Sequence, residues 1–98
     1  MELMRTHIGQ SLRAARISQG RTLRAVASDA RVSLGYLSEV ERGQKEASSE
    51  LLNAICRALN LSLSTVLTDV IDLVKRHETP VLTVVPTSEA ELSDVNAA

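Results

Sequence analysis

A group of polar side chains that could do chemistry lies in one stretch of this 98-residue chain, between residues 22 and 45. They offer hydroxyl, guanidinium, ammonium, carboxylate and amide groups, on Thr22, Arg24, Tyr36, Ser38, Glu39, Arg42, Gln44 and Lys45. Groups of this kind bind phosphate oxygens, and hydroxyls and carboxylates also pair with base edges in the major groove. The stretch therefore predicts a surface that contacts DNA.

Two short predicted helices joined by a tight turn would hold this surface in place. Thr22 and Ser33 are natural N-caps, and Gly43 suits a helix end in the left-handed region. Apolar residues recur at spacings of three and four along both helices: Leu23, Val26, Ala27, Ala30, Leu37 and Val40. A further apolar residue, Val32, fills the turn. Residues 22–43 thus predict a helix-turn-helix, with a hairpin in an ordinary helical bundle as the alternative.

The outer face of the second predicted helix is expected to read bases. Leu34 can touch a thymine methyl group, and Gly35 lets the backbone approach DNA closely. Ser38 can donate to or accept from either kind of base edge. Glu39 can accept from a cytosine amino group, and the alternative is that its carboxylate holds a neighbouring arginine.

The basic residues are concentrated in the half of the chain that holds the predicted motif. Residues 1–45 contain eight Lys/Arg and four Asp/Glu, a net charge of +4, and residues 46–98 contain three and eight, a net charge of −5, which sum to −1. We expect phosphate contacts from Thr22, Arg24, Tyr36, Arg42, Gln44 and Lys45, with Arg21 and Arg31 as further candidates. For each arginine, a solvated surface charge is the alternative.

Three further helices are expected, over about residues 6–18, 49–59 and 61–77. The second of these begins after a cap at Ser48 or Ser49. The inward-facing residues of the first two are expected to be Ile8, Leu12, Ala15, Leu51, Leu52, Ile55 and Leu59. Arg13 and Arg16 are expected to face outward.

The last predicted helix carries more apolar residues than one small domain needs to cover one helix face. They are Leu63, Val66, Leu67, Val70, Ile71, Leu73 and Val74. We expect part of this stripe to dock on the core and part on a second subunit, which makes these residues the predicted dimerisation set. Coverage by the C-terminal residues is the alternative.

Several classes of function are disfavoured by what the sequence lacks. A lone Cys56 cannot form an intrachain disulfide, and we expect it to pack as a small apolar residue, with a redox role as the alternative. His7 and His77 lie far apart in the sequence without ligands at metal-binding spacing, so neither a metal nor another cofactor is expected. There is no catalytic triad arrangement or phosphate-binding loop, which predicts a protein that is not an enzyme. No apolar run or leader predicts a membrane contact, so a cytoplasmic location is expected.

Residues 78–98 differ in composition from the rest of the chain. Two prolines bracket residues 81–85, which could form an extended arm, and the remainder is acidic and poor in apolar residues. The expected organisation is a DNA-binding domain over residues 1–77, including its dimerisation helix at about 61–77, followed by a flexible or extended C-terminal tail.

Residues from about Ile8 to Leu67 resemble the phage-repressor class (Cro/C1, or XRE) of helix-turn-helix regulators. Within this class, RTLR followed by ARVSLGYLSEVERGQKEASSELL is similar to actinobacterial regulators of Clp protease genes. The resemblance implies an all-α, five-helix, lambda-repressor-like DNA-binding domain. It also implies a homodimer on a palindromic operator that activates genes for Clp proteolysis and stress functions.

Regulators of this kind are themselves Clp substrates, so the small apolar end, Ala97 and Ala98, is a candidate degradation signal on the resemblance. Two positions depart from the class: Arg31 stands where the turn usually has glycine, and Ala47 stands where many members have proline. A non-glycine residue at 31 must accept a left-handed backbone or shift the turn. An antitoxin or adaptor that keeps the helix-turn-helix but binds another protein is the alternative function.

Overall fold

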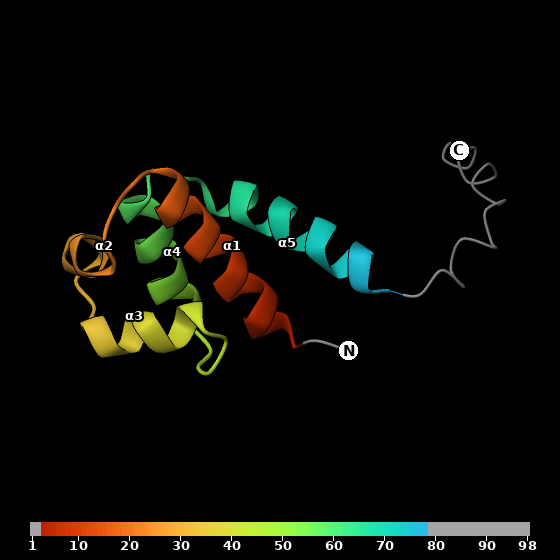
Figure 1. Cartoon of the computed structure of the whole chain (residues 1–98), viewed down its shortest axis with the longest axis horizontal. Helices are drawn as coiled ribbons and strands as arrows, with labels where there is room; N and C mark the ends of the chain where they lie inside the picture. Colours follow the sequence, from red (N-terminus) through yellow and green to blue (C-terminus); the bar gives the residue numbers. More distant parts are fainter. Residues whose placement is uncertain (1–2, 79–98) are drawn as a thin grey trace, which may run out of the picture.

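The computed structural model describes residues 3–78, which form five helices (Figure 1). Their bounds are α1 Met4–Ser18, α2 Leu23–Ala30, α3 Leu34–Glu41, α4 Ser49–Ala58 and α5 Leu63–His77. Helix α1 packs against α3 and α5, and α2 packs against α3 and α4. The described part of the chain contains no strand, so the predicted all-α fold is confirmed. Helices α2, α3 and α4 cluster at one end, and α5 runs alongside α1 toward the other end (Figure 1).

A hydroxyl side chain starts each of four helices. The caps Thr22, Ser33, Ser48 and Ser62 accept from the backbone N–H three residues on, at 3.0 to 3.2 Å. Each cap satisfies a donor that would otherwise have no partner inside its helix. The caps predicted at Thr22 and Ser33 are confirmed, and the structure selects Ser48 over Ser49 for α4.

The turn between α2 and α3 is made by Arg31 in the left-handed region, with φ +62° and ψ +43°. The turn keeps its place and the arginine accepts the conformation, at a cost of roughly 1 kcal/mol relative to glycine. Gly43, with φ +75°, follows α3 as predicted.

The core is aliphatic and joins all five helices. Its buried hydrophobic residues are Leu12, Val26, Ala27, Ala30, Leu37, Val40, Leu52, Ile55, Cys56, Leu59, Val66 and Val70. The prediction that Leu51 faces inward is wrong, because this side chain is 36% exposed while its neighbour Leu52 takes the buried position.

Gly9 allows the closest approach between two helices. A Cβ at this position would lie 2.6 Å from the Glu41 carbonyl oxygen and would also clash with the Val40 carbonyl oxygen. Only glycine lets α1 cross the end of α3 at this spacing. The C-terminal turn of α3 is therefore positioned by α1.

No single helix among the described residues has the length and hydropathy of a membrane span. Helices α4 and α5 pass that test only when taken together, and the chain bends by 103° between them.

Candidate nucleic-acid interface

The N-terminal half of α3 presents an open surface. Leu34, the first residue of the helix, is 37% exposed, and a Cβ built on Gly35 would meet nothing within 4 Å. The opposite face of α3 is anchored by Leu37 and Val40, which are buried in the core. The fold therefore turns Leu34 and Gly35 outward, where another molecule can approach the backbone of α3.

Glu39 lies next to a loop lysine. Its Oε1 atom is 3.4 Å from Lys45 Nζ, and both side chains are about half exposed. An arginine was the expected alternative partner of this carboxylate, and Lys45 takes that place instead. Oε2 of Glu39 has no hydrogen-bond partner among residues 3–78, so it stays available to an incoming donor. Ser38, on the same turn, is half-buried.

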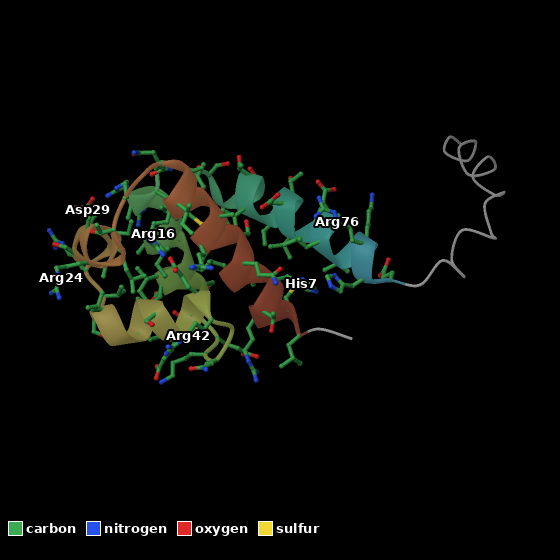
Figure 2. All side chains as sticks on the ribbon, in the orientation of Figure 1. His7, Arg16, Arg24, Asp29, Arg42 and Arg76 are labelled. Atoms are coloured by element: carbon green, nitrogen blue, oxygen red, sulfur yellow. The ribbon has the colours of Figure 1, made fainter. Side chains whose placement is uncertain are left out.

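Basic side chains flank this face on both sides. Arg24 on α2 and Arg42 at the end of α3 are exposed, and neither forms an ion pair within the described part of the chain. Figure 2 shows Arg24 at the outer edge of α2 and Arg42 beside α3. Thr22 and Gln44 are also exposed, whereas Tyr36 packs partly against the core. Charges arranged in this way can neutralise a phosphate backbone on either side of α3.

The loop that carries Gln44 and Lys45 is tied to α1. Arg5 donates through Nε to the Gly43 carbonyl oxygen at 3.0 Å, and its Nη1 atom lies 3.5 Å from Glu46 Oε2. These contacts fix where the loop leaves α3, and hence where its two polar side chains stand.

A groove between α1 and α3 extends the surface. It has a volume of about 930 Å³, and its lining includes Gln10, Arg13 and Ile17 from α1 and Ser38 and Arg42 from the α3 side. Gln10 is a lining residue that was not predicted from the sequence. Its position three residues before the outward-facing Arg13 was the available signal, because residues three apart share a helix face.

Arg16 and Glu41 form a buried ion pair below this groove, so the expectation that Arg16 faces outward is wrong. Arg16 donates through Nε to Glu41 Oε2 at 2.7 Å and through Nη2 to Oε1 at 3.0 Å. A third donor, Nη1, reaches the Arg21 carbonyl oxygen at 3.0 Å. The hydrogen bonds with Glu41 raise the pKa of Arg16 above its usual value. The guanidinium of Arg16, labelled in Figure 2, thus joins α1 to the end of α3 and to the loop residue that precedes the cap of α2.

The apolar stripe of α5 divides into two parts. Val66 and Val70 are buried in the chain's own core, so their assignment to a subunit contact is corrected. Leu63 and Val74 are half-buried against that core, and Leu73 is half-buried as well. Leu67 and Ile71, at 41% and 52% exposed, are the members of the stripe that face solvent.

The two histidines, distant in sequence, meet in the fold. The rings of His7 and His77 lie with their centroids 5.0 Å apart where α1 and α5 run together. No group of three or more metal-ligating side chains forms among residues 3–78. Cys56 is fully buried, and burial raises the pKa of its thiol, which fits the predicted packing role. The predicted arm at 81–85 and the end at Ala97 and Ala98 lie outside the described residues.

Comparison with known proteins agrees with this geometry. The helix-turn-helix family pattern matches residues 12–66. Over 76 residues the chain is 63% identical to the transcriptional regulator ClgR of Mycobacterium tuberculosis, covering 78% of this chain and 68% of that protein.

Solved structures give the same result. The clp gene regulator ClgR from Corynebacterium glutamicum matches with 49% identity and a TM-score of 0.71, over 74% of this chain and 94% of that one. The restriction-modification controller protein C.Esp1396I, solved as a tetramer with its 35 base-pair operator, shares the fold at 18% identity and a TM-score of 0.68, over 74% and 95% of the chains. The chain is therefore no enzyme: it belongs to the XRE-type helix-turn-helix family of DNA-binding transcriptional regulators that includes ClgR.

Proposed function

We propose that this regulator binds an inverted-repeat operator as a homodimer and activates genes for Clp proteolysis and stress functions. The open α3 surface between unpaired arginines, on a chain so similar to ClgR, is the observation that carries the proposal. In this reading, residues 1–77 form the DNA-binding unit and residues 78–98 a tail. The site of action is DNA in the cytoplasm.

The proposed roles follow from where the side chains stand. Leu34, Gly35, Ser38 and Glu39 approach the base edges from α3. The phosphate contacts come from Thr22, Arg24, Tyr36, Arg42, Gln44 and Lys45, which set the register on the duplex without reading sequence. The exposed part of the α5 stripe supplies the subunit contact.

Selection of bound sequences from random duplex DNA tests this function directly. The purified full chain, at moderate salt, should enrich an inverted repeat whose half-site centres lie one helical turn apart, roughly 34 Å. The enriched motif should then occur upstream of Clp protease genes. Failure to enrich any sequence would contradict the proposal and favour the antitoxin or adaptor function, which co-purification of a stoichiometric second protein would support.

Replacing Glu39 and replacing Lys45 should change DNA binding in different ways. Glu39→Ala removes a base-reading acceptor and should change the preferred operator sequence at one position of each half-site. Lys45→Ala removes a phosphate contact, so it should weaken all sequences alike and lower the salt slope of binding by about 1. Binding titrations against operator variants at several salt concentrations measure both. An unchanged sequence preference in Glu39→Ala would contradict the base-reading role.

We also propose that abundance of the regulator is set by Clp proteolysis through the small apolar end at Ala97 and Ala98. The proposal is supported by the two small apolar residues at these positions and by the similarity to ClgR. Replacing both alanines with aspartate should lengthen the half-life in cells that contain Clp protease and leave it unchanged in cells that lack it. Equal half-lives of the two forms in Clp-containing cells would refute this part of the proposal.

A further inference from the structure

A second basic surface lies in a hollow between the C-terminal ends of α2 and α4. The hollow has a volume of about 610 Å³ and is lined by Arg21, Asp29, Arg31, Arg57 and Asn60 over a floor of small alanine side chains. Three guanidinium groups therefore stand against one carboxylate. We call this surface the α2–α4 hollow.

Two of the three guanidinium groups are uncompensated. Arg21 donates through Nη2 to Asp29 and through Nη1 to the Ala58 carbonyl oxygen, so its charge is neutralised and its position is fixed. Arg31 and Arg57 are exposed, and no acidic side chain among residues 3–78 lies within ion-pair distance of either. The hollow thus offers two unpaired guanidinium groups beside a third that is paired with Asp29.

The backbone at the hollow is unusual as well. Across the described chain, Arg31 and Asn60 are the non-glycine residues with positive φ, at +62° and +58°, and both line the hollow. Asparagine adopts this conformation readily, but arginine does so at a cost that glycine would avoid. Strained positions of this kind cluster at binding sites. Here the strain places a guanidinium where glycine would leave no side chain.

The hollow is separate from the α3 surface. Asp29, which lines the hollow, lies on the outer side of α2 in Figure 2, whereas Arg42, which flanks α3, lies on the side of α3 that faces away from α2 and α4. None of the residues that we propose to contact bases or phosphates lines the hollow, and Arg21 and Arg31, named above as further phosphate candidates, are assigned to the hollow instead. A duplex held by α3 would therefore leave the α2–α4 hollow open to a further partner.

The chemistry of the hollow favours an acidic peptide over a free phosphate. It lies at two helix C-termini, whose partial negative charge disfavours the concentrated charge of a free phosphate, a group that prefers helix N-termini. The carboxylate side chains of a peptide carry one charge each, and separate carboxylates can accept from the two guanidinium groups. We propose that the α2–α4 hollow binds an acidic segment of a second protein through Arg31 and Arg57, while α3 holds DNA.

A fluorescent decaglutamate peptide tests this surface with the full chain, by anisotropy. Binding should be saturable, salt-sensitive and undiminished by saturating duplex DNA of mixed sequence. The double variant Arg31→Gln/Arg57→Gln should bind the peptide about ten-fold more weakly. The matched control Lys75→Gln/Arg76→Gln removes the same charge from the end of α5 and should bind like the natural chain. This test needs no operator, so it can fail while the proposed function stands.

A third variant separates charge from folding. Arg31→Gly removes the guanidinium and also relieves the left-handed strain, so it should unfold at an equal or higher temperature yet bind the peptide more weakly. If Arg31→Gly bound the peptide as tightly as the natural chain does, the proposal would be overturned. So would equal losses in the two double variants, displacement of the peptide by DNA, or inorganic pyrophosphate binding as tightly as the peptide.

Discussion

A glycine inside a helix normally lowers its stability, because the backbone loses more conformational freedom on folding than at any other residue. Gly35 sits in α3 with open space where its Cβ would be, so packing does not require it. The free space is on the surface proposed to approach base edges. Replacing this glycine with alanine should therefore raise the stability of the fold and weaken DNA binding.

Gly35→Ala should raise the free energy of unfolding by about 0.5–1 kcal/mol and still weaken operator binding, since a methyl group would keep the backbone from the DNA. Chemical denaturation and a binding titration on the same preparation measure the two effects. Gly9→Ala is the matched control, because its Cβ would clash with backbone of α3 and lower the stability instead. Unchanged DNA affinity in Gly35→Ala would contradict close approach at this point.

Single residues also show where reasoning from sequence reaches its limit. The caps at Thr22 and Ser33 were predictable because a cap and its N–H partner lie three residues apart. Leu51 and Leu52 are adjacent leucines at the start of α4, and the apolar pattern did not distinguish which one faces the core. The lysine beside Glu39 sits in a loop whose path depends on contacts with α1, which local spacing does not encode.

At the scale of elements, local periodicity predicted all five helices but not the contacts between them. The pair Arg16–Glu41 joins residues 25 positions apart. Arg16 lies three residues after the outward-facing Arg13, so nothing in the sequence indicated that Arg16, rather than Arg13, forms the buried pair. The His7–His77 contact joins the two ends of the domain in the same way. Such contacts depend on how helices cross, and Gly9 fixes one of those crossings through backbone atoms that no side-chain pattern reveals.

Breaking the Arg16–Glu41 pair should loosen α1 from α3. Glu41→Gln leaves the buried guanidinium without its full charge partner, so the free energy of unfolding should fall by about 2 kcal/mol. The matched control Glu46→Gln, at an exposed pair with Arg5, should change it by less than about 0.5 kcal/mol. Urea denaturation measures the free energy of unfolding of both variants. Equal losses would show that the buried pair stabilises the fold no more than the exposed pair does.

The raised pKa of Arg16 also sets the expected pH dependence of this contact. A group whose pKa is higher in the folded state stabilises the fold fully below its unfolded pKa and loses that effect only as pH rises through the folded value. Because the ordinary pKa of arginine is already far above neutrality, the Arg16 charge should contribute equally across the working pH range.

For the whole molecule, the proposed dimer depends on the exposed apolar residues of α5. Ile71→Asp places a charge on this face and should shift the protein to a monomer with much weaker operator binding, because the two half-sites would no longer be held together. Sedimentation velocity and a binding titration measure these changes. Thr65→Asp, exposed on another face of α5, is the control and should remain dimeric. A dimeric Ile71→Asp would place the subunit contact elsewhere.

The aliphatic core has an optical consequence. The chain contains one tyrosine and neither tryptophan nor phenylalanine, and that tyrosine, Tyr36, lies half-buried in α3. All of its intrinsic near-ultraviolet fluorescence therefore comes from one ring on the helix proposed to enter the groove. An unlabelled sample carries a built-in reporter whose emission can follow the docking of α3 in stopped-flow experiments, with no substitution and no attached dye.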